Sequence, residues 1–476
     1  MASKKELVTK FTKAIREGNA AIFAGAGLSR LSGYVDWQNL LRPLADEIDL
    51  DVDKENDLVA VAQYYRNKRG TRGFINQTIV DAFSSDAEIN ENVRILTRLP
   101  IPTYWTTNYD CLIEDGLKES SRKPDVKITQ EQLAVTAPGR DAVIYKMHGD
   151  AQFPSEAVLT KDDYETYECK RPLFRTALKG DLISKTFLFI GFSFEDPNLN
   201  YVLSQIHSLV GENKRDHYCF FKRIEKDPGE TDEEYTYRMV RQKLREEDLQ
   251  RYGIQAVMID DYSEITDLFK KVETAVKMNN VFISSSADSF DSTWSEASAG
   301  ELAYTLARAL VKNDYRVTSG FGTGIGSSII NGALSEIYES KYKHIDELLC
   351  LRPFPQNIAD PVKRKECFTK YRNDMIEEVG TVIFLFGNKM EEGILTDAAG
   401  CLEEFEISRK RGKIIIPVAS TGSAARAIME EIKKKMDDYP YLKEELSVLE
   451  NETDLQKLTD AVVRIIKKQQ NMSIIV

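Results

Sequence analysis

Four short polar segments in the first half of the sequence each follow a run of apolar residues, and their side-chain types are suited to chemistry. In chain order they contribute Gly25, Ala26 and Ser29, then Asn108 and Asp110, then His148, and finally Gly191 and Ser193. A glycine turn at the end of a strand lets backbone N–H groups approach a pyrophosphate. The Asn108 amide can bind a ribose hydroxyl or a water molecule, Asp110 could meet a carboxamide, and the His148 imidazole can act as a general base. Together the segments predict a dinucleotide pocket with His148 and Asn108 as its catalytic candidates.

A structural alternative exists for each segment. A Gly-x-Gly turn between a strand and a helix is often only a tight connection. Asp110 is well placed as the N-cap of the helix that continues through Leu112 and Ile113. A lone histidine is more often structural than catalytic, but an imidazole at the carboxyl end of a strand lies where open α/β sheets bind ligands. Ser193 and Asp196 could face the same crevice, so the functional interpretation rests on the four segments acting together.

The spacing of the apolar runs predicts the elements that position these segments. Strand-like runs fall at residues 20–23, 103–105, 143–146, 186–190, 218–221 and 255–259, with helical patterns between them. This alternation predicts a doubly wound, mostly parallel sheet with helices on both faces. The helical patterns at residues 37–48 and 57–67 predict a helical insertion or cap.

The second half of the chain repeats the α/β rhythm and carries a glycine-rich loop. Strands are expected at residues 281–284, 316–318, 348–352, 382–386 and 414–418. After the second of these, Gly320, Gly322 and Gly324 alternate at the start of an apolar helix, a pattern typical of a phosphate-binding loop. Ser284 and Ser285 end the first strand and could line the same crevice.

A domain boundary is predicted near the middle of the chain. With 476 residues, the chain exceeds what one hydrophobic core usually supports. An amphipathic helix is expected at residues 263–278, and a new strand starts directly after Asn279 and Asn280. We therefore expect two α/β domains, residues 1–279 and residues 280–476.

The overall composition excludes several classes of function. The formal net charge of −12 argues against nucleic acid as the main partner, because phosphate binding needs a concentrated basic surface. The 6 cysteines form no Cys-x-x-Cys pair, so neither a zinc ribbon nor a disulfide framework is predicted. No segment approaches the roughly 18 apolar residues of a membrane span, and the N-terminus lacks an apolar signal core. We expect a cytoplasmic protein that uses no metal and binds neither nucleic acid nor membrane.

The four segments of the first half resemble the sirtuin fold family in order and content. The matches are a Gly-Ala-Gly-x-Ser loop, a Thr-x-Asn-x-Asp strand end, a His-Gly pair and a late Gly-x-Ser, and four ordered matches are more specific than one. Sirtuin deacylases also carry a four-cysteine zinc ribbon and a Pro-Asp-Phe-Arg segment. Here the ribbon is absent and the segment reads Val35-Asp36-Trp37-Gln38. The resemblance therefore implies a site that binds NAD and labilises its nicotinamide bond, with water as the acceptor in place of an acylated protein.

The glycine-rich second half resembles the SLOG superfamily of nucleotide-binding domains. Enzymes of that superfamily carry a Pro-Gly-Gly-x-Gly-Thr loop, which the comparable region, residues 387–404, lacks, so binding without turnover is the better inference. The two halves together resemble the NADase effectors of bacterial Thoeris anti-phage systems, in which a SLOG domain follows a sirtuin-like domain. The matching stretches include residues 20–28, 103–110, 145–150 and 186–194.

This family resemblance implies a signal-dependent enzyme. A cyclic ADP-ribose isomer, made by a partner protein with a TIR domain, would bind the SLOG domain and switch on the hydrolysis of NAD+. Carried over by position, Arg372, Lys389 and Glu404 would contact the signal, with the glycine loop near its phosphates. Judged singly, these three residues would be surface charges. The resemblance also implies a homo-oligomer, with a tetramer favoured.

Two alternatives to hydrolysis stay open at this stage. The first is an NAD-dependent deacylase or ADP-ribosyltransferase that uses the same pocket with another acceptor. The second is a non-catalytic nucleotide sensor whose first domain only binds NAD. The presence of both Asn108 and His148 argues against the sensor, because a mere binding pocket needs no base.

Overall fold

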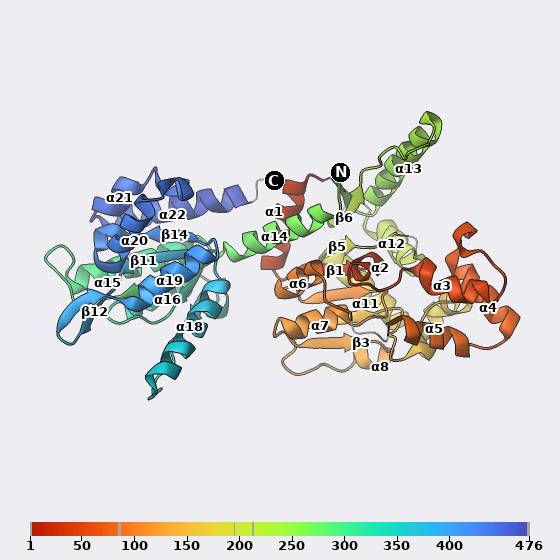
Figure 1. Ribbon diagram of the computed structural model, residues 1–476, viewed down its shortest axis with the longest axis horizontal. Helices are drawn as coiled ribbons and strands as arrows, with labels where there is room; N and C mark the ends of the chain where they lie inside the picture. The colour runs from red at the N-terminus through yellow and green to blue at the C-terminus, as the bar shows by residue number, and fades with distance from the viewer. Residues whose placement is uncertain (1, 84–86, 195, 212–213, 474–476) are drawn as a thin grey trace. The chain divides into compact units, whose positions relative to one another are not determined.

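The computed structural model describes residues 2–83, 87–194, 196–211 and 214–473. By their contacts, the residues divide into two units, Met1–Glu273 and Thr274–Val476. This division falls within helix α14, Ser263–Lys277, and the boundary expected at residues 279 and 280 lies just beyond the end of that helix. Each unit is an α/β structure built on a parallel sheet, which confirms the predicted fold class (Figure 1).

In the sheet of the first unit, the loops that carry the predicted site residues follow the carboxyl ends of neighbouring parallel strands. In sheet order its strands are β3 Pro124–Lys127, β4 Ala142–Lys146, β2 Thr103–Thr106, β1 Ala20–Ala24, β5 Thr186–Ile190, β6 His217–Lys222 and β7 Ile254–Ile259. The paired strands are parallel, and β1 and β5 are buried along their whole length because helices cover both faces. Ala24 is aligned with Thr106 and with Ile190, so the loops after β1, β2 and β5 begin side by side.

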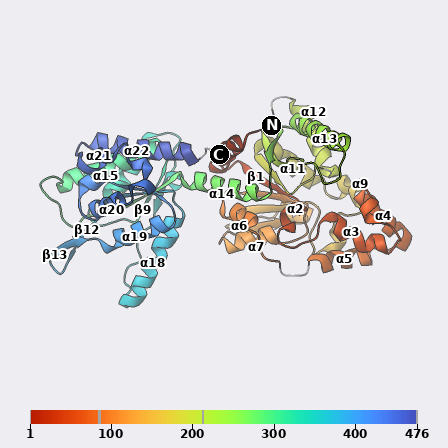
Figure 2. The ribbon, with the colours of Figure 1, turned by 45° about the horizontal axis from the view of Figure 1, so that its top comes forward.

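Most helices of the first unit connect these strands, and three of them form an insertion. The helices are α1 Lys4–Arg16, α2 Ala26–Arg30, α3 Trp37–Asp46, α4 Leu58–Arg69, α5 Gly73–Phe83, α6 Glu91–Arg98, α7 Leu112–Glu119, α8 Gln130–Leu133, α9 Lys161–Glu165, α10 Tyr167–Lys170, α11 Pro172–Ser184, α12 Pro197–Val210 and α13 Asp232–Arg251, before α14. Figures 1 and 2 show α3, α4 and α5 grouped beside the sheet. The first two correspond to the helical patterns predicted at residues 37–48 and 57–67, and α5 extends this insertion.

The insertion has an apolar core of its own. Leu41, Leu44, Val61 and Ile75 pack together in it, and Tyr109 from the loop after β2 belongs to the same cluster. The helix ends are set by local chemistry, since Asp36 caps α3 and Asp57 caps α4 through side-chain hydrogen bonds. The shared core fixes the insertion against the loop that carries Asn108.

The second unit has the sheet order β10-β9-β8-β11-β14. Its elements are β8 Asn280–Ser286, α15 Glu296–Lys312, β9 Arg316–Ser319, α16 Gly326–Glu339, α17 Ile345–Leu348, β10 Leu349–Leu351, α18 Pro361–Glu377, β11 Thr381–Phe386, β12 Asn388–Glu391, β13 Ile394–Asp397, α19 Ala399–Lys410, β14 Ile414–Pro417, α20 Ser423–Lys433, α21 Leu446–Asn451 and α22 Leu455–Ser473. The strand order changes direction between β8 and β11, and such a switch point is where open α/β sheets place ligands.

Two features of the sheets differ from the sequence-based expectation. The short strand β3 was not predicted, and neither was the antiparallel hairpin of β12 and β13, which follows directly after β11. The hairpin register pairs Lys389 with Thr396. Both elements are short and mostly polar, so they lack the apolar runs from which strands are predicted.

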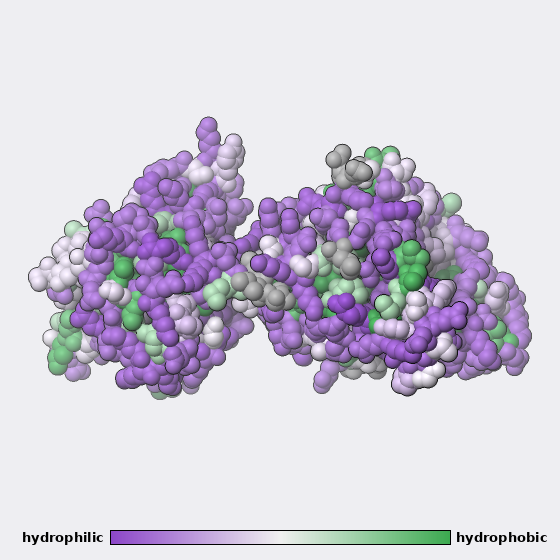
Figure 3. All heavy atoms as spheres, turned by 90° about the horizontal axis from the view of Figure 1, so that it is seen from above, coloured by the Kyte–Doolittle hydropathy of each residue, from purple (hydrophilic) through white to green (hydrophobic). Residues whose placement is uncertain are grey.

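The visible surface is mostly hydrophilic. In Figure 3, apolar side chains form small separate groups among hydrophilic ones. Within the described residues, no helix is both long enough and apolar enough to cross a membrane.

Candidate active site

The loops that follow four neighbouring strands of the first unit surround one cavity. These strands are β4, β2, β1 and β5, and in a parallel sheet their carboxyl ends lie along the same edge. The cavity has a volume of about 660 Å³. From these loops it is lined by Ala26, Gly27, Thr107, His148, Gly191, Phe192, Ser193 and Asp196. A volume of several hundred Å³ is typical of a site for a small molecule or cofactor.

His148 is almost completely buried and reaches the cavity without a hydrogen bond on its ring. Its relative exposure is 1%, and neither ring nitrogen has a hydrogen-bond partner among the described residues. Nε2 lies 3.2 Å from Oδ2 of Asp196, which is close enough for an ion pair, although the direction of approach makes no hydrogen bond. The rings of Tyr164 and Tyr167 stand edge-on to the imidazole, with centroids 5.4 and 6.4 Å away. The imidazole is therefore held between the Asp196 carboxylate and two tyrosine rings.

Asp196 provides the negative charge next to this imidazole. Burial alone would raise the pKa of the Asp196 carboxyl, yet that pKa lies below its usual range because His148, the Leu199 N–H and the Tyr164 hydroxyl stabilise the carboxylate. The Leu199 N–H donates to Oδ1 over 2.9 Å, and the Tyr164 hydroxyl donates to Oδ2 over 3.2 Å. A buried carboxylate beside a histidine can orient the ring and stabilise its protonated form.

Asn108 lies at the end of a chain of hydrogen bonds. Its Nδ2 donates to the Gly25 carbonyl over 3.0 Å and to the Ser29 hydroxyl over 2.8 Å. The Ser29 hydroxyl in turn donates to Oδ2 of Asp110 over 2.6 Å. Because both amide hydrogens are used inside the protein, the Asn108 Oδ1 is the group left to accept from a ligand.

Asp110 combines this role with the capping role that the sequence suggested. Its Oδ1 accepts the Leu112 N–H over 3.1 Å, although the N-cap position of α7 itself belongs to Cys111. Asp110 and Ser29 are 6% and 3% exposed, so their polar groups are committed to each other and to the loops. In this structure they support Asn108. These three residues do not line the main cavity but a small hollow beside it, which shares Ala26, Asp36, Trp37 and Thr107 with the cavity.

The glycines of the first and fourth segments let two loops touch. A Cβ on Gly25 would lie 2.4 Å from the Gly191 carbonyl oxygen, and one on Gly191 would lie 2.2 Å from the Leu28 nitrogen. The N–H of Gly25 donates to the Ile190 carbonyl, and that of Gly27 donates to the Gly191 carbonyl, each over 2.9 Å. These N–H groups are therefore used between the loops. The helix that follows, α2, has only 5 residues.

The opposite wall of the cavity comes from residues that the sequence-based site did not include. The insertion contributes Asp36, Trp37 and residues 56–59, and α9 contributes Lys161, Tyr164 and Glu165. Lys161 pairs with Asp57 over 2.9 Å, which joins α9 to the insertion. Asp36 and Trp37 belong to the segment that stands in place of the sirtuin Pro-Asp-Phe-Arg. The altered segment at Asp36 and Trp37 was therefore the one sequence feature that could have indicated this wall. Tyr164 and Lys161 lie in a segment without a recognisable sequence motif.

In the second unit, three of the predicted signal residues form a buried cluster. The Ser284 hydroxyl donates to Oε2 of Glu404 over 2.6 Å, and Nε of Arg372 donates to Oε1 of the same carboxylate over 3.3 Å. Arg372 also donates to Oε2 of Glu403 over 2.7 Å, and its guanidinium lies 4.9 Å from the centroid of the Phe354 ring. Burial raises the pKa of the Glu404 carboxyl, while Ser284 and Arg372 act in the opposite direction.

The glycine loop of this unit packs on the end of β8. A Cβ on Gly322 would lie 1.8 Å from the Ser285 carbonyl oxygen, and one on Gly324 would lie 2.1 Å from the Ala287 carbonyl oxygen. Gly320 is less constrained, with its nearest neighbour, Phe354, at 3.4 Å. The loop thus lies next to the end of β8, where Ser285 is located.

Lys389 lies apart from the buried cluster. It is on the β12–β13 hairpin, its side chain is 55% exposed, and its ion pair is with Glu391 at 3.4 Å.

Comparisons with known proteins agree with this arrangement. Residues 264–469 match the model of the Sir2- and TIR-associating SLOG family, and residues 102–250 match that of a SIR2-like domain. The protein named NAD(+) hydrolase ThsA from Bacillus cereus strain MSX-D12 is 45% identical over 471 residues, which cover 98% of each chain. A protein of the same name from Enterococcus faecium is 43% identical over 480 residues, covering 98% of this chain and 99% of that protein.

A more distant relative matches one part of the chain. Defense-associated sirtuin 2 of Bacillus subtilis is 29% identical over 235 residues, which cover 48% of this chain and 23% of that protein. The ThsA relatives, in contrast, match nearly from end to end and confirm the family resemblance found in the sequence. The chain belongs to the ThsA family of NAD+ hydrolases.

Proposed function

We propose that this chain cleaves NAD+ to ADP-ribose and nicotinamide in the cavity at the carboxyl edge of its first sheet. The observation that carries the proposal is the state of His148, a buried imidazole that lines the cavity next to an ionised Asp196 and has no hydrogen bond on either ring nitrogen. Asp196 lies 3.2 Å from Nε2 and can orient the ring, while Nδ1 has no hydrogen-bond partner among the described residues, which is the arrangement of a carboxylate-supported base. The names of the ThsA relatives, each an NAD(+) hydrolase, agree with the proposal.

The reaction needs a base and a polar surface around the ribose. The N-glycosidic bond breaks with its electron pair moving to the nicotinamide nitrogen, and the ribose passes through an oxocarbenium-like state. Water then attacks C1′ as His148 accepts its proton, a contribution typically worth about 10²- to 10⁴-fold. Asp196 stabilises the imidazolium that forms. No further co-reactant is required.

Asn108 orients the ribose and the attacking water through its Oδ1. Ser29 and Asp110 hold the amide in that orientation, as their hydrogen bonds indicate. Ala26 and Ser193 line the wall near the glycine loops and are proposed to contact the rest of the dinucleotide. Gly25 and Gly191 contribute by letting the two loops meet.

The second unit is proposed to bind the activating signal, a cyclic ADP-ribose isomer supplied by a TIR-domain partner. The support is the cluster of Arg372, Glu404 and Ser284 beside the glycine loop, which offers a cation for a pyrophosphate and acceptors for ribose hydroxyls. Ser285, with Gly320, Gly322 and Gly324, would form the phosphate side, and Lys389 would contribute from the hairpin. We propose that a homo-oligomer, with a tetramer favoured, carries the response and acts in anti-phage defence.

The test is an NAD+ turnover assay with and without cyclic ADP-ribose isomers, with products separated by chromatography. We expect ADP-ribose and nicotinamide in equal amounts, and a large loss of turnover in His148→Ala and Asn108→Ala. Ser204→Ala, on the exposed face of α12, is the matched control. Wild-type turnover in both site variants would overturn the assignment, and transfer of ADP-ribose to a protein or an acyl group would overturn hydrolysis.

A further inference from the structure

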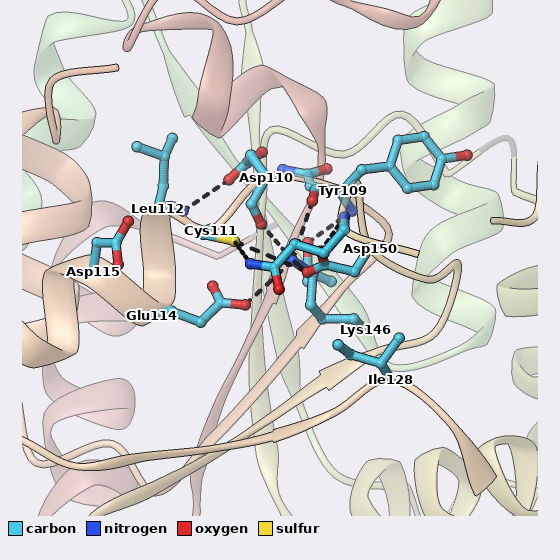
Figure 4. A network of polar contacts seen from close by, with 12 residues as sticks. Tyr109, Asp110, Cys111, Leu112, Glu114, Asp115, Ile128, Lys146 and Asp150 are labelled. Atoms are coloured by element: carbon cyan, nitrogen blue, oxygen red, sulfur yellow. Dashed lines mark hydrogen bonds and ion pairs between the residues drawn. The ribbon is translucent and has the colours of Figure 1, made fainter. Parts of the chain in front are cut away.

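A buried lysine lies directly beneath the loops that carry Asn108 and His148. Lys146 is the last residue of β4, and its side chain is fully buried. Its Nζ donates to the Asp110 carbonyl over 2.6 Å, to the Tyr109 carbonyl over 3.2 Å and to Oδ2 of Asp150. Figure 4 shows the ammonium surrounded by these oxygens. The three hydrogens of the ammonium group are thus all used.

The oxygens around Lys146 come from both catalytic loops. Tyr109 and Asp110 directly follow Asn108 in the loop after β2, and Asp150 is two residues after His148 in the loop after β4. The other carboxylate oxygen of Asp150 accepts the Gln152 N–H over 2.8 Å, which closes its own loop. One charged group therefore ties together the two segments whose relative placement the reaction depends on.

The carboxylates around Lys146 form a site suited to a cation, and the Lys146 ammonium occupies that site. Oε1 of Glu114 lies 3.2 Å from Nζ, and Glu114, Asp150 and Cys111 stand close enough to one another to ligate a metal ion. The ammonium already compensates the two carboxylates from within. Cys111 has little thiolate character, because burial raises the pKa of its thiol to about 11.

We propose that Lys146 is a positioning residue for NAD+ cleavage, which fixes the backbone at residues 109 and 110 and thereby sets the Asn108 amide relative to His148. This inference rests on the proposed function. It differs from a general stabilising role, because a purely stabilising Lys146 could be replaced by any neutral, well-packed group without loss of catalysis. A misplacement of about 1 Å, by contrast, can cost roughly 100-fold in rate.

The test separates positioning from stability by removing the whole charge network. Lys146→Met alone would leave two buried carboxylates uncompensated, so the diagnostic protein is the triple variant Lys146→Met, Glu114→Gln, Asp150→Asn, which is neutral. We expect its kcat for NAD+ to fall by about 10- to 100-fold with KM within about twofold of wild type. Glu114→Gln is the matched control, since it keeps every hydrogen bond of Lys146, and we expect it to retain its kcat.

Hydrogen exchange gives a second readout that does not depend on turnover. Amides of residues 107–112 should exchange faster in the triple variant than in wild type, while strand β1 stays protected. Wild-type kcat and wild-type exchange in the triple variant would overturn the proposal. Should the triple variant fail to fold, Asp150→Ala decides. It keeps both carbonyl contacts of Lys146 but has no side-chain oxygen to accept from the ammonium, so the tie to the His148 loop is lost. An unchanged kcat in Asp150→Ala is contrary to positioning. All turnover is measured with the activating cyclic ADP-ribose isomer present. Absence of NAD+ turnover in wild type under these conditions would overturn only the proposed function, and the exchange comparison would still test Lys146.

Discussion

At the scale of single residues, the candidate site depends on which polar groups are already satisfied by the protein. Both amide hydrogens of Asn108 are hydrogen-bonded within the protein, which leaves its Oδ1 to accept from a ligand. Both carboxylate oxygens of Asp110 already accept hydrogen bonds from the protein. His148 has used neither ring nitrogen. Residue types alone could nominate all three, but only their hydrogen bonds separate the groups that face a ligand from those that hold another residue in place.

The sequence indicated the four polar segments but not the partners that complete them. His148 stood out because it ends a strand next to a glycine, a pattern with a physical reason behind it. Tyr164 and Lys161 carried no such signal, because their contacts with His148 and Asp57 join segments that are distant in the sequence. The sequence placed Lys146 at the end of a strand but did not indicate its role. The role of a charged side chain in a buried strand depends on its partners, which come from distant segments.

A second histidine, His217 in β6, makes a prediction about pH and stability. It is buried, its Nδ1 accepts the Phe187 N–H over 3.1 Å, and burial lowers its pKa to about 3. The unfolded chain binds the proton with a pKa near 6.5, so the stabilisation is complete above about pH 6.5 and is lost as the pH falls towards 3. Between pH 7.5 and pH 5.5 this group should cost the first unit about 1 kcal/mol.

Urea unfolding followed by circular dichroism at these two pH values measures the effect. We expect His217→Gln, whose side-chain oxygen can still accept the Phe187 N–H, to lose about 1 kcal/mol less than wild type on acidification. Equal losses in the two proteins would show that His217 is not the group responsible.

At the scale of elements, the site depends on the order of strands in the sheet. Each strand that precedes a loop of the candidate site was predicted from the sequence. These strands are mostly buried, so their residues form short, mainly apolar runs. It did not supply the order that makes β4, β2, β1 and β5 neighbours. That order is set by crossovers between distant segments, and only the resemblance to a known family could anticipate it.

The contact between the loops after β1 and β5 is the element-level feature most open to a mutational test. Gly191 has a φ of +63°, and a Cβ there would lie 2.2 Å from the Leu28 nitrogen. We expect Gly191→Ala to destabilise the first unit by about 2 to 4 kcal/mol, from overpacking and the left-handed backbone. Because the two loops form the cavity wall, NAD+ turnover should fall as well. Thermal unfolding and the turnover assay measure the two effects.

Gly180, on the exposed face of α11, provides the matched control for that substitution. A Cβ on Gly180 would meet nothing within 4 Å. Gly180→Ala should therefore leave turnover unchanged and raise stability by about 0.5 to 1 kcal/mol, as expected inside a helix. If both alanine variants behaved alike, the close approach of the loops would not be the cause.

At the scale of the whole molecule, one chain joins a SIR2-like unit, proposed to cleave NAD+, to a SLOG-family unit that is proposed to bind a nucleotide signal. An enzyme that destroys a central cofactor must rest in an inactive state, and a signal can activate it only by binding the active state more tightly. The buried polar cluster of the second unit is suited to this task, since Arg372 is held by Glu403 and Glu404 before any ligand arrives. A signal that offers a pyrophosphate competes for the same cation.

This exchange of partners at Arg372 leads to the last prediction. In Arg372→Glu, three carboxylates face the signal, so binding of a cyclic ADP-ribose isomer should weaken by about 2 kcal/mol or more, roughly 30-fold in Kd. The concentration of signal needed for NAD+ turnover should rise in parallel, because binding and activation are linked. Isothermal titration and the turnover assay on the full chain measure the two quantities.

Arg409→Glu is the control for the change of charge itself. Arg409 lies on the same helix as Glu404, α19, but forms its ion pair with Glu406 at the surface. It should respond to the signal as wild type does. A full response of Arg372→Glu would mean that the signal acts elsewhere. A loss of binding without any loss of response would break the link between the two units, since a ligand can shift an equilibrium only by its difference in affinity for the two states.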